Sequence, residues 1–426
     1  MIEINIRDRI KLETKGHSMY NVRREEYKTK GIDDINFRVS PTPFKLTKSQ
    51  KKELDDIGKA ICSYMDCCLE LYKTNDSIHE ILDRGKPEEY RNVEEIKYLF
   101  LRPDIILTDS GFSVCEIETS PFGLGLAEVL NRAYGNEGYD TIIHQNELKN
   151  YIQSKVEPSG TIAYSEKVKA FSGQLDFMAD QVFSDKQKLW DAKQISENSN
   201  MNKEIYRAFY LSEKYRDKNI AKLLENNSVS LPSSTPQFEE KALLSFIWDK
   251  RCVQFLKEKL GKSDFELLRK VIPKTWILGE EQYVDGGLAS GKATSLDLME
   301  LGKKSRKFVL KQSGFQDASS WGEGVVFLHK IGGQKASEML KSALEDKEHL
   351  YIIQEFNQGK IMPMSYINEE GIFQSINVKL RLTPYYAYMG SDKGKLIAAK
   401  VTGCENTEYI HASTASINTA VEIERD

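Results

Sequence analysis

The sequence contains no long apolar run. Although 40% of its 426 residues are hydrophobic, no stretch reaches the roughly 18 consecutive apolar residues that a membrane-spanning helix needs. The segment MIEINIRDRIKLETKG, residues 1–16, carries charges throughout and lacks the apolar core of a secretory signal peptide. We therefore expect a cytoplasmic protein that does not insert into a membrane.

Cysteine is scarce as well, and neither sign of charge predominates. Six cysteines in a chain of this length do not make a disulfide framework, and Cys62, Cys67 and Cys68 have no histidine at zinc-site spacing nearby. Sixty basic against 64 acidic residues leave a net charge of −4, which provides no general attraction to nucleic acid or to an anionic membrane. The composition therefore indicates free thiols and a partner that is neither nucleic acid nor a membrane. It does not indicate the oligomeric state.

The hydrophobic periodicity indicates a mixed α/β chain. Residues 47–75 have helical periodicity and begin at a capping residue. Between 136 and 230 the sequence alternates, with strand candidates at 160–166 and 204–213 on either side of a helical segment. This alternation predicts a small α/β lobe.

The second half of the chain has a different pattern. The segment 226–237 is polar, rich in Ser and Pro, and is the clearest linker. Residues 238–261 predict one long helix. Beyond Pro273 the chain is rich in strands, which are predicted within KFVLKQ, GVVFLHK, LYIIQEF and INVKLRL.

The segment RPDIILTDSGFSVCEIETSP, residues 102–121, predicts a β-hairpin that carries acids on one face. With a three-residue loop that places Gly111 at the left-handed position, the register pairs Asp104 with Glu116. Side chains alternate along a strand, so Glu118 lies on the same side as these two acids. Three neighbouring carboxylates need a cation, and hard oxygen ligands suit Mg²⁺ with nucleotide phosphates. The alternative is a solvated acidic face on an ordinary surface hairpin.

The segment KFVLKQSGFQDASSWGEGVVFL, residues 307–328, predicts a strand, a small-residue loop and a second strand. Lys311 ends the first strand and would place its ammonium beside phosphates. Ser320, Gly322 and Gly324 allow the loop backbone to approach an anion closely. The alternative is a flexible surface hairpin with an exposed lysine.

Two further strands supply candidate ligands of a nucleotide. YIIQEFNQGK leads an apolar strand into Gln354, Glu355 and Phe356, a segment that offers adenine an apolar slot and a backbone edge; a plain edge strand has the same pattern. In SINVKLRLTPYY the alternating side chains of Asn377, Lys379 and Arg381 share one face, as suits phosphate and carboxylate groups. A solvent-facing basic strand is the alternative there.

These segments, in this order, resemble the circularly permuted ATP-grasp enzymes, in particular the glutathionylspermidine synthase-like group. The family motif is Arg-x-Asp, a turn, and a Glu-x-Asn pair before a small residue and Pro. The corresponding residues here are Arg102, Asp104, Glu116, Glu118 and the Ser-Pro dipeptide at 120–121. The acidic hairpin precedes the lysine strand and the loop, as in the permuted group. The resemblance covers about residues 95–415.

The resemblance implies an α/β (α+β) ATP-grasp-like fold with a small pre-ATP-grasp α/β lobe. The expected parts are an N-terminal helical cap of uncertain role at 1–95, the metal-binding hairpin of the core at 96–135, the small lobe at 136–235 and the nucleotide-binding lobes at 236–426. It also implies ATP and Mg²⁺ as cofactors, with small-molecule carboxylate and amine substrates that the sequence does not identify.

The implied activity is an ATP-dependent carboxylate–amine ligase that forms an amide or peptide bond through an acyl phosphate. In that interpretation Asp104, Glu116 and Glu118 hold Mg²⁺, and Arg102 and Arg381 act on the carboxylate and the transferring phosphoryl group. The residues expected to bind the nucleotide are Lys250, Lys311, Ser320, Gly322, Gly324, Gln354, Glu355, Phe356 and Lys379.

Three departures from the family pattern leave alternatives open. Glu118 stands where the family usually has Asn, and the loop contains Ser-Trp-Gly-Glu-Gly in place of Gly-Arg-Glu-Gly. The first ATP lysine is either Lys241 or Lys250, of which Lys250 is preferred. The competing functions are a catalytically inactive ATP-grasp-like nucleotide-binding protein, an ATP-dependent small-molecule kinase and a plain interaction protein.

Overall fold

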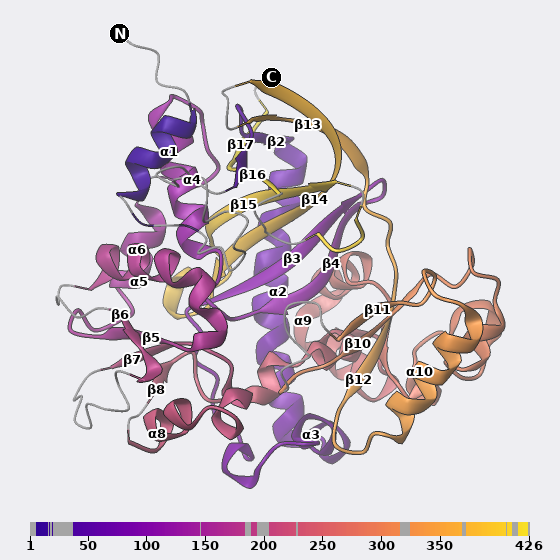
Figure 1. Ribbon diagram of the computed structural model, residues 1–426. Helices are drawn as coiled ribbons and strands as arrows, with labels where there is room; N and C mark the ends of the chain where they lie inside the picture. The colour runs from indigo at the N-terminus through magenta and orange to yellow at the C-terminus, as the bar shows by residue number, and fades with distance from the viewer. Residues whose placement is uncertain are drawn as a thin grey trace.

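A seven-stranded sheet forms the centre of the protein in the computed structural model (Figure 1). The structure describes residues 6–15, 17, 19, 37–144, 146–183, 189–193, 204–226, 229–315, 324–368, 372–405, 407–410 and 416–424. In spatial order the strands of the central sheet are β13 (Ile361–Ile367), β1 (Arg38–Val39), β16 (Ile417–Thr419), β15 (Leu396–Glu405), β14 (Phe373–Ala387), β3 (Phe100–Thr108) and β4 (Gly111–Glu118).

Three smaller sheets surround it. One is antiparallel and contains β11 (Val325–Phe327), β10 (Phe308–Gln312), β12 (Tyr351–Glu355) and β9 (Thr275–Ile277). A second is parallel and contains β6 (Leu189–Asp191), β5 (Thr161–Tyr164), β7 (Ile205–Ala208) and β8 (Val229–Leu231). The third pairs β17 (Val421–Ile423) with β2 (Phe44–Leu46). The alternation predicted between 136 and 230 is thus present, although the second predicted strand ends at Ala208.

Nine α-helices are found within the described ranges. They are α1 (Ile6–Thr14), α2 (Lys48–Thr74), α3 (Asp76–Asp83), α4 (Leu124–Asn136), α5 (Glu147–Gln153), α6 (Ser172–Val182), α8 (Lys218–Asn226), α9 (Lys250–Val271) and α10 (Gly333–Glu345). Figure 1 shows α4, α5 and α6 on one side of the central sheet and α10 on the outer side of the sheet that contains β9 to β12, where it packs on one face. None of the described helices is long and apolar enough to cross a membrane.

Helix α2 begins where the sequence predicts and covers one face of the central sheet. Thr47 caps it, and the Thr47 and Gln50 side chains and backbones form a reciprocal capping box. From β14, Leu380 and Leu382 belong to the same buried cluster as the apolar residues of α2. The residues of β14 that alternate with these leucines, such as Arg381, therefore face the opposite side of the sheet.

The predicted long helix at 238–261 is wrong in its first half. Residues Lys241–Trp248 form a 3₁₀ helix, and α9 starts only at Lys250. Asp249 separates the two because its side chain accepts a hydrogen bond from the Arg251 backbone N–H, which starts a new helix. A kink at Gly261, where φ is 76°, interrupts α9 further along.

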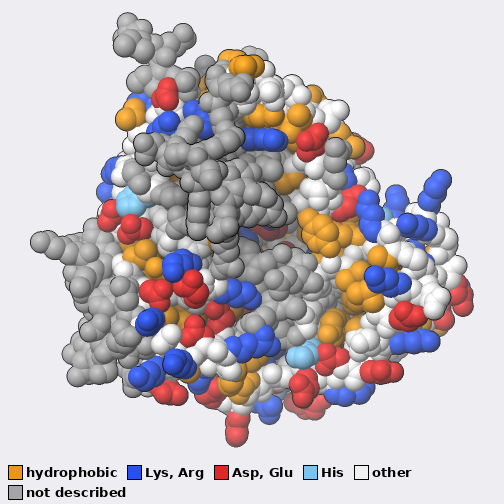
Figure 2. Space-filling view, viewed as in Figure 1, with side chains coloured by type: hydrophobic (Ala, Val, Ile, Leu, Met, Phe, Trp, Pro, Cys, Tyr) orange, Lys and Arg blue, Asp and Glu red, His pale blue; other side chains and the backbone are white. Residues whose placement is uncertain are grey.

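Charged side chains of both signs are interspersed over the described surface visible in Figure 2. This distribution agrees with the near balance of 60 basic and 64 acidic residues. All six cysteines are free thiols, and five of them are buried. The expectation of free thiols is confirmed.

Gly58 allows α2 to contact the sheet closely. A Cβ atom at this position would lie 2.3 Å from the Tyr386 ring, and that buried ring also donates its hydroxyl to the Leu54 carbonyl. We expect Gly58→Ala to lower the free energy of unfolding by about 1–3 kcal/mol, because overpacking outweighs the better helix propensity of Ala. Urea-induced unfolding measures the change.

Gly302→Ala is the matched control, since no atom lies within 4 Å of a Cβ added there. It should change stability by less than about 0.5 kcal/mol. Equal stability of the Gly58→Ala protein and the wild type would contradict the close packing of α2 on β14.

Candidate functional site

One cavity of about 610 Å³ brings together segments that are up to three hundred residues apart. Its walls come from the β3–β4 hairpin, strands β14 and β15, the β10–β12 sheet and the small α/β region. A volume of this size is typical of a small-molecule site. The charged residues that line it are Arg102, Asp104, Glu116, Glu118, Lys241, Lys311, Glu355, Lys379, Arg381, Lys400 and Glu408.

The acidic hairpin has the predicted pairing but a different turn. Asp104 lies opposite Glu116, as expected. However, Thr108 pairs with Gly111 and not with Phe112, so the loop has two residues and not three. A β-bulge that leaves Cys115 unpaired restores the register beyond the turn.

The bulge also shapes the cavity wall. It turns both Cys115 and Glu116 into the lining, whereas strict alternation would place neighbouring residues on opposite faces. A sequence pattern does not show an extra residue of this kind, because the strand propensity of the segment is the same with or without it.

Two arginines bind Asp104. The Arg381 Nη1 atom is 2.9 Å from Asp104 Oδ2, and the Arg102 Nε atom is 3.4 Å from Asp104 Oδ1. Asp104 is only 7% exposed, so these cations offset the cost of burying its charge. Arg102 also donates to the Phe122 carbonyl at 2.8 Å, which ties the hairpin to the segment before α4.

The two glutamates of the hairpin have opposite electrostatic environments. Burial opposes the ionisation of Glu116, but Lys241 and Lys311 outweigh it and lower its pKa to about 2. The Lys241 Nζ atom is 2.7 Å from Glu116 Oε1. Burial, together with the neighbouring charge of Glu116, raises the pKa of Glu118 to about 7. Within the described residues, Glu118 has no ion-pair partner.

The three predicted metal ligands, Asp104, Glu116 and Glu118, all line the cavity. Asp104 and Glu116 already form ion pairs with basic side chains. In the described part of the chain, no group of three or more His, Cys, Asp or Glu side chains is arranged to hold a metal ion. The chemistry of the donor set, three carboxylates on one wall, still fits a hard divalent ion. The metal role of Asp104, Glu116 and Glu118 stays a prediction.

The structure places Lys241 in the cavity and Lys250 outside it, contrary to the preference for Lys250. Lys250 is exposed, donates to the Gln282 carbonyl at 3.1 Å and does not line the cavity. Lys241 lines it and is 8% exposed. The adjacent Glu240 is held by a buried ion pair with Lys86 at 2.5 Å, which orients the short 3₁₀ helix.

Lys311 lies in the cavity as predicted, near the end of β10, where it pairs with Ile352 of β12. Its Nζ atom donates to Gln354 Oε1 at 2.7 Å and to the Cys115 carbonyl at 2.9 Å. Burial is the main cause that lowers the pKa of Lys311. Ser320 and Gly322 lie outside the described residues, while the Gly324 carbonyl accepts from the Gln312 N–H at 3.0 Å.

Gln354, Glu355 and Phe356 all line the cavity. Gln354 and Glu355 end β12, which is not an edge strand because it lies between β10 and β9, and Phe356 follows it directly. The backbone N–H groups of Glu355 and Phe356 already donate to the carbonyls of Lys274 and Lys307. The apolar slot here is formed by Val309, Val325, Phe327, Phe356, Tyr409 and Ile410.

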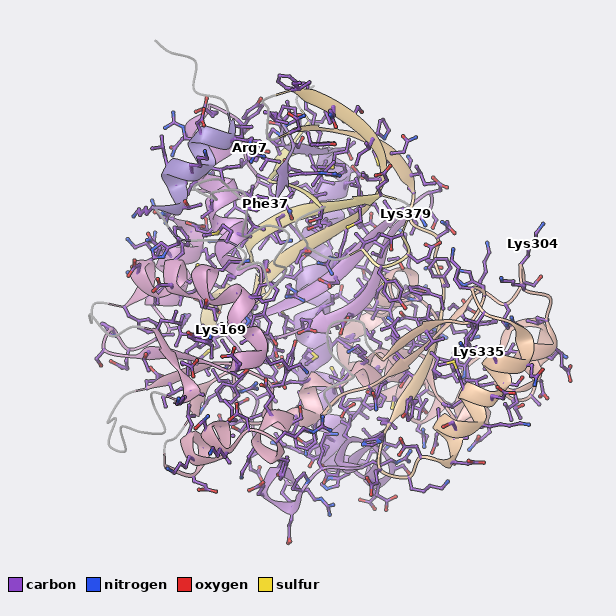
Figure 3. All side chains as sticks on the ribbon, viewed as in Figure 1. Arg7, Phe37, Lys169, Lys304, Lys335 and Lys379 are labelled. Atoms are coloured by element: carbon purple, nitrogen blue, oxygen red, sulfur yellow. The ribbon has the colours of Figure 1, made fainter. Side chains whose placement is uncertain are left out.

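Lys379 and Arg381 project into the cavity from β14, but Asn377 does not line it and is exposed. Lys379 forms an ion pair with Glu408 at 2.5 Å. In Figure 3 it lies on the side of the central sheet nearest the β9–β12 sheet. Of the three donors predicted to share one face of this strand, only Lys379 and Arg381 therefore line the cavity.

Sequence reasoning missed Lys400. This residue lines the cavity from β15 and is 2% exposed. Burial, with the charge of Arg381 second, lowers its pKa to about 7. The available signal was one lysine inside the otherwise apolar strand LIAAKVTGC. Phe171 and Tyr210 of the small α/β region also line the cavity without having been predicted.

The protein thus combines a mixed α/β fold with a charged cavity of a size typical of small-molecule sites. No family model and no curated protein matches the sequence. Among solved structures, a glutathione synthetase-like effector from Globodera pallida, in its apo form, matches with a TM-score of 0.54 and 11% sequence identity. The match covers 97% of this chain and 95% of that chain.

The chain therefore shares its mixed α/β fold with that glutathione synthetase-like protein. This confirms, at the level of the fold, the resemblance expected from the sequence. Because the identity is 11%, the match carries the fold alone to this chain.

The raised pKa of Glu118 has a consequence for stability. The folded state holds this proton more tightly than the unfolded state, so the associated stabilisation is present at low pH and is lost as the pH rises from about 4.5 through 7. We expect Glu118→Gln to gain about 2–3 kcal/mol relative to the wild type between pH 5 and pH 8. Urea-induced unfolding at both pH values measures this gain.

Glu405→Gln, at the exposed end of β15, is the control and should show no such pH-dependent gain. The interpretation fails if the stability difference between the Glu118→Gln protein and the wild type is the same at pH 5 and at pH 8.

Proposed function

We propose that this protein is an ATP-dependent carboxylate–amine ligase. The observation that carries the proposal is the convergence, in one cavity, of the acidic hairpin, two buried lysines and the Gln354–Phe356 segment. The fold match supports ATP binding, since the matched protein is glutathione synthetase-like. A ligase needs such a cavity to position ATP beside a carboxylate and to exclude water.

In this proposal Lys241 and Lys311 neutralise the phosphates of the bound nucleotide. Both are buried and line the cavity, and both act on the charge of Glu116. The base occupies the apolar slot next to Gln354 and Phe356, where Phe327 and Tyr409 have their ring centroids 4.8 Å apart. Because the N–H groups of Glu355 and Phe356 are already bonded, the nucleotide uses other atoms of this segment.

Asp104, Glu116 and Glu118 would hold Mg²⁺. The ion supplies neutralisation of the β- and γ-phosphate charge. Glu118 is the acid most available to bind the ion, since it has no ion pair among the described residues. Asp104 and Glu116, in contrast, already form ion pairs with cationic side chains.

The reaction has two steps in this proposal. A carboxylate oxygen of the substrate attacks the γ-phosphorus, the bond to the bridging oxygen breaks, and ADP leaves. An amine then attacks the acyl carbon, phosphate leaves, and the amine loses a proton to complete the amide. Arg102 and Arg381 lie at the acidic hairpin, where they neutralise the carboxylate and the transferring phosphoryl group.

The order of the parts supports a circular permutation. The acidic hairpin, at Phe100–Glu118, precedes the lysine strand Phe308–Gln312 along the chain. In the permuted ATP-grasp arrangement the metal-binding acids likewise come before the lysine and the loop.

A nucleotide-binding protein without turnover is the second candidate. It is favoured by the ion pairs that already engage Asp104 and Glu116 and by Glu118 at the family's Asn position. Release of ADP in the presence of Mg²⁺ and panels of carboxylates and amines, followed by mass detection of an amide, separates the ligase from this candidate.

The two lysines near 240–250 provide a matched pair for the test. We expect Lys241→Met to weaken the binding of AMP-PNP with Mg²⁺ at least tenfold, because a buried charge-assisted contact to phosphate is lost. Lys250→Met should leave the affinity within twofold of the wild type, since Lys250 lies outside the cavity. Isothermal titration calorimetry, repeated with EDTA, measures both affinities.

Thermal unfolding of the two variants without nucleotide shows whether each is folded. The proposal is refuted if folded Lys241→Met protein binds AMP-PNP as tightly as the wild type, or if the wild type binds no AMP-PNP at millimolar concentration.

A further inference from the structure

Lys400 and Thr383 form part of the cavity floor on two neighbouring strands. They are directly paired in the antiparallel β14–β15 register, and Arg381 pairs with Thr402 two residues away. Paired residues on adjacent strands present their side chains to the same face. The floor of the cavity therefore carries a row of polar side chains on the face opposite α2.

Lys400 is a buried cation without a counter-ion among the described residues. Its Nζ atom donates to Thr402 Oγ1 at 2.8 Å, which leaves two of its three N–H groups unused. The charged or titratable groups that act on it are Arg381 from β14, Arg102 and Asp104 from β3 and Cys404 from its own strand. Asp104 is already engaged by the two arginines.

Two other donors of the floor are unused. Thr383 is 2% exposed, and its Oγ1 atom makes no hydrogen bond to any described residue. The Arg381 Nε atom is also buried and makes no hydrogen bond to any described residue. A buried donor without a partner costs about 1–3 kcal/mol, so such a group in a cavity wall points to a ligand acceptor. Lys400, Thr383 and Arg381 together offer N–H and O–H groups to one anion.

An apolar wall adjoins this donor set. The Phe122 ring lies 5.4 Å from Phe171 and 6.0 Å from Tyr210 between centroids, and all three line the cavity. Gly123, with φ of 85°, connects the wall to the floor: a Cβ atom there would lie 2.9 Å from the Tyr385 hydroxyl and 3.4 Å from Lys400 Cε.

We propose that the carboxylate substrate is an apolar carboxylic acid. Its carboxylate accepts hydrogen bonds from Lys400 and Thr383, and its non-polar body contacts Phe122, Phe171 and Tyr210. This assignment rests on the proposed function for the reaction in which the acid takes part, but the acid site itself is defined by the floor and the wall of the cavity. Lys400 is thus the residue that selects an anion at this end of the cavity.

The test uses 3-phenylpropanoate and its neutral counterpart 3-phenylpropanamide as probes, titrated calorimetrically at pH 6.5. Wild-type protein should bind the acid at least tenfold more tightly than the amide. Lys400→Met should remove this preference by weakening the acid alone, and Thr383→Val should weaken the acid about threefold. Lys335→Met, on the exterior of α10 in Figure 3, should bind both probes as the wild type does.

The wild-type comparison of acid with amide needs no variant, so it stands even if a substitution prevents folding. Equal binding of the two probes by the wild type, no binding of the acid at millimolar concentration, or an unchanged preference in folded Lys400→Met overturns the inference. AMP-PNP is titrated into the same proteins. Acid selection without nucleotide binding would refute the ligase while supporting the acid site, and nucleotide binding without acid selection would refute the acid site alone.

Discussion

The need to neutralise buried carboxylates governs the arrangement of this protein. Asp104 and Glu116 line the cavity with little exposure to solvent, and an unpaired charge in such a place is costly. Their counter-charges come from β14, from the 3₁₀ helix at 241–248 and from Arg102 within the hairpin. Because Arg381 and Lys241 come from separate parts of the chain, their ion pairs fix the hairpin, β14 and the 3₁₀ helix relative to one another around one cavity.

The same constraint explains why the cavity is suited to an anionic ligand. Lys311 and Lys400 are buried and have lowered pKa values because burial disfavours their charged forms. An anion that enters the cavity restores the missing negative charge and stabilises both ammonium groups. In our proposals the phosphates bind near Lys241 and Lys311, and the substrate carboxylate binds near Lys400; all three lysines line the same cavity.

Local patterns were sufficient for much of the fold. The capped helix α2, the strands around Lys311, Gln354 and Arg381 and the alternation of the small lobe depend on short-range periodicity and are present as predicted. The single helix expected at 238–261 is wrong because the Asp249 side chain caps a new helix that starts at Lys250. The two-residue turn was missed because Thr108 to Gly111 permits either loop length, and only pairing with the rest of the sheet selects one.

By itself the sequence determined the acidic hairpin and the order of the lysine strand and the linker, because strand alternation and turn residues act over a few positions. The predicted Asp104–Glu116 pairing is present only because the bulge at Cys115 compensates for a turn that is one residue shorter than predicted. Only the tertiary structure decided which lysine enters the cavity, since Lys241 and Lys250 are nine residues apart and equally basic. It also revealed Lys400 and its unused neighbour Thr383, whose environment comes from paired strands and from a glycine about 280 residues away along the chain. Burial and long-range charge are properties of the assembled fold, and no local pattern encodes them.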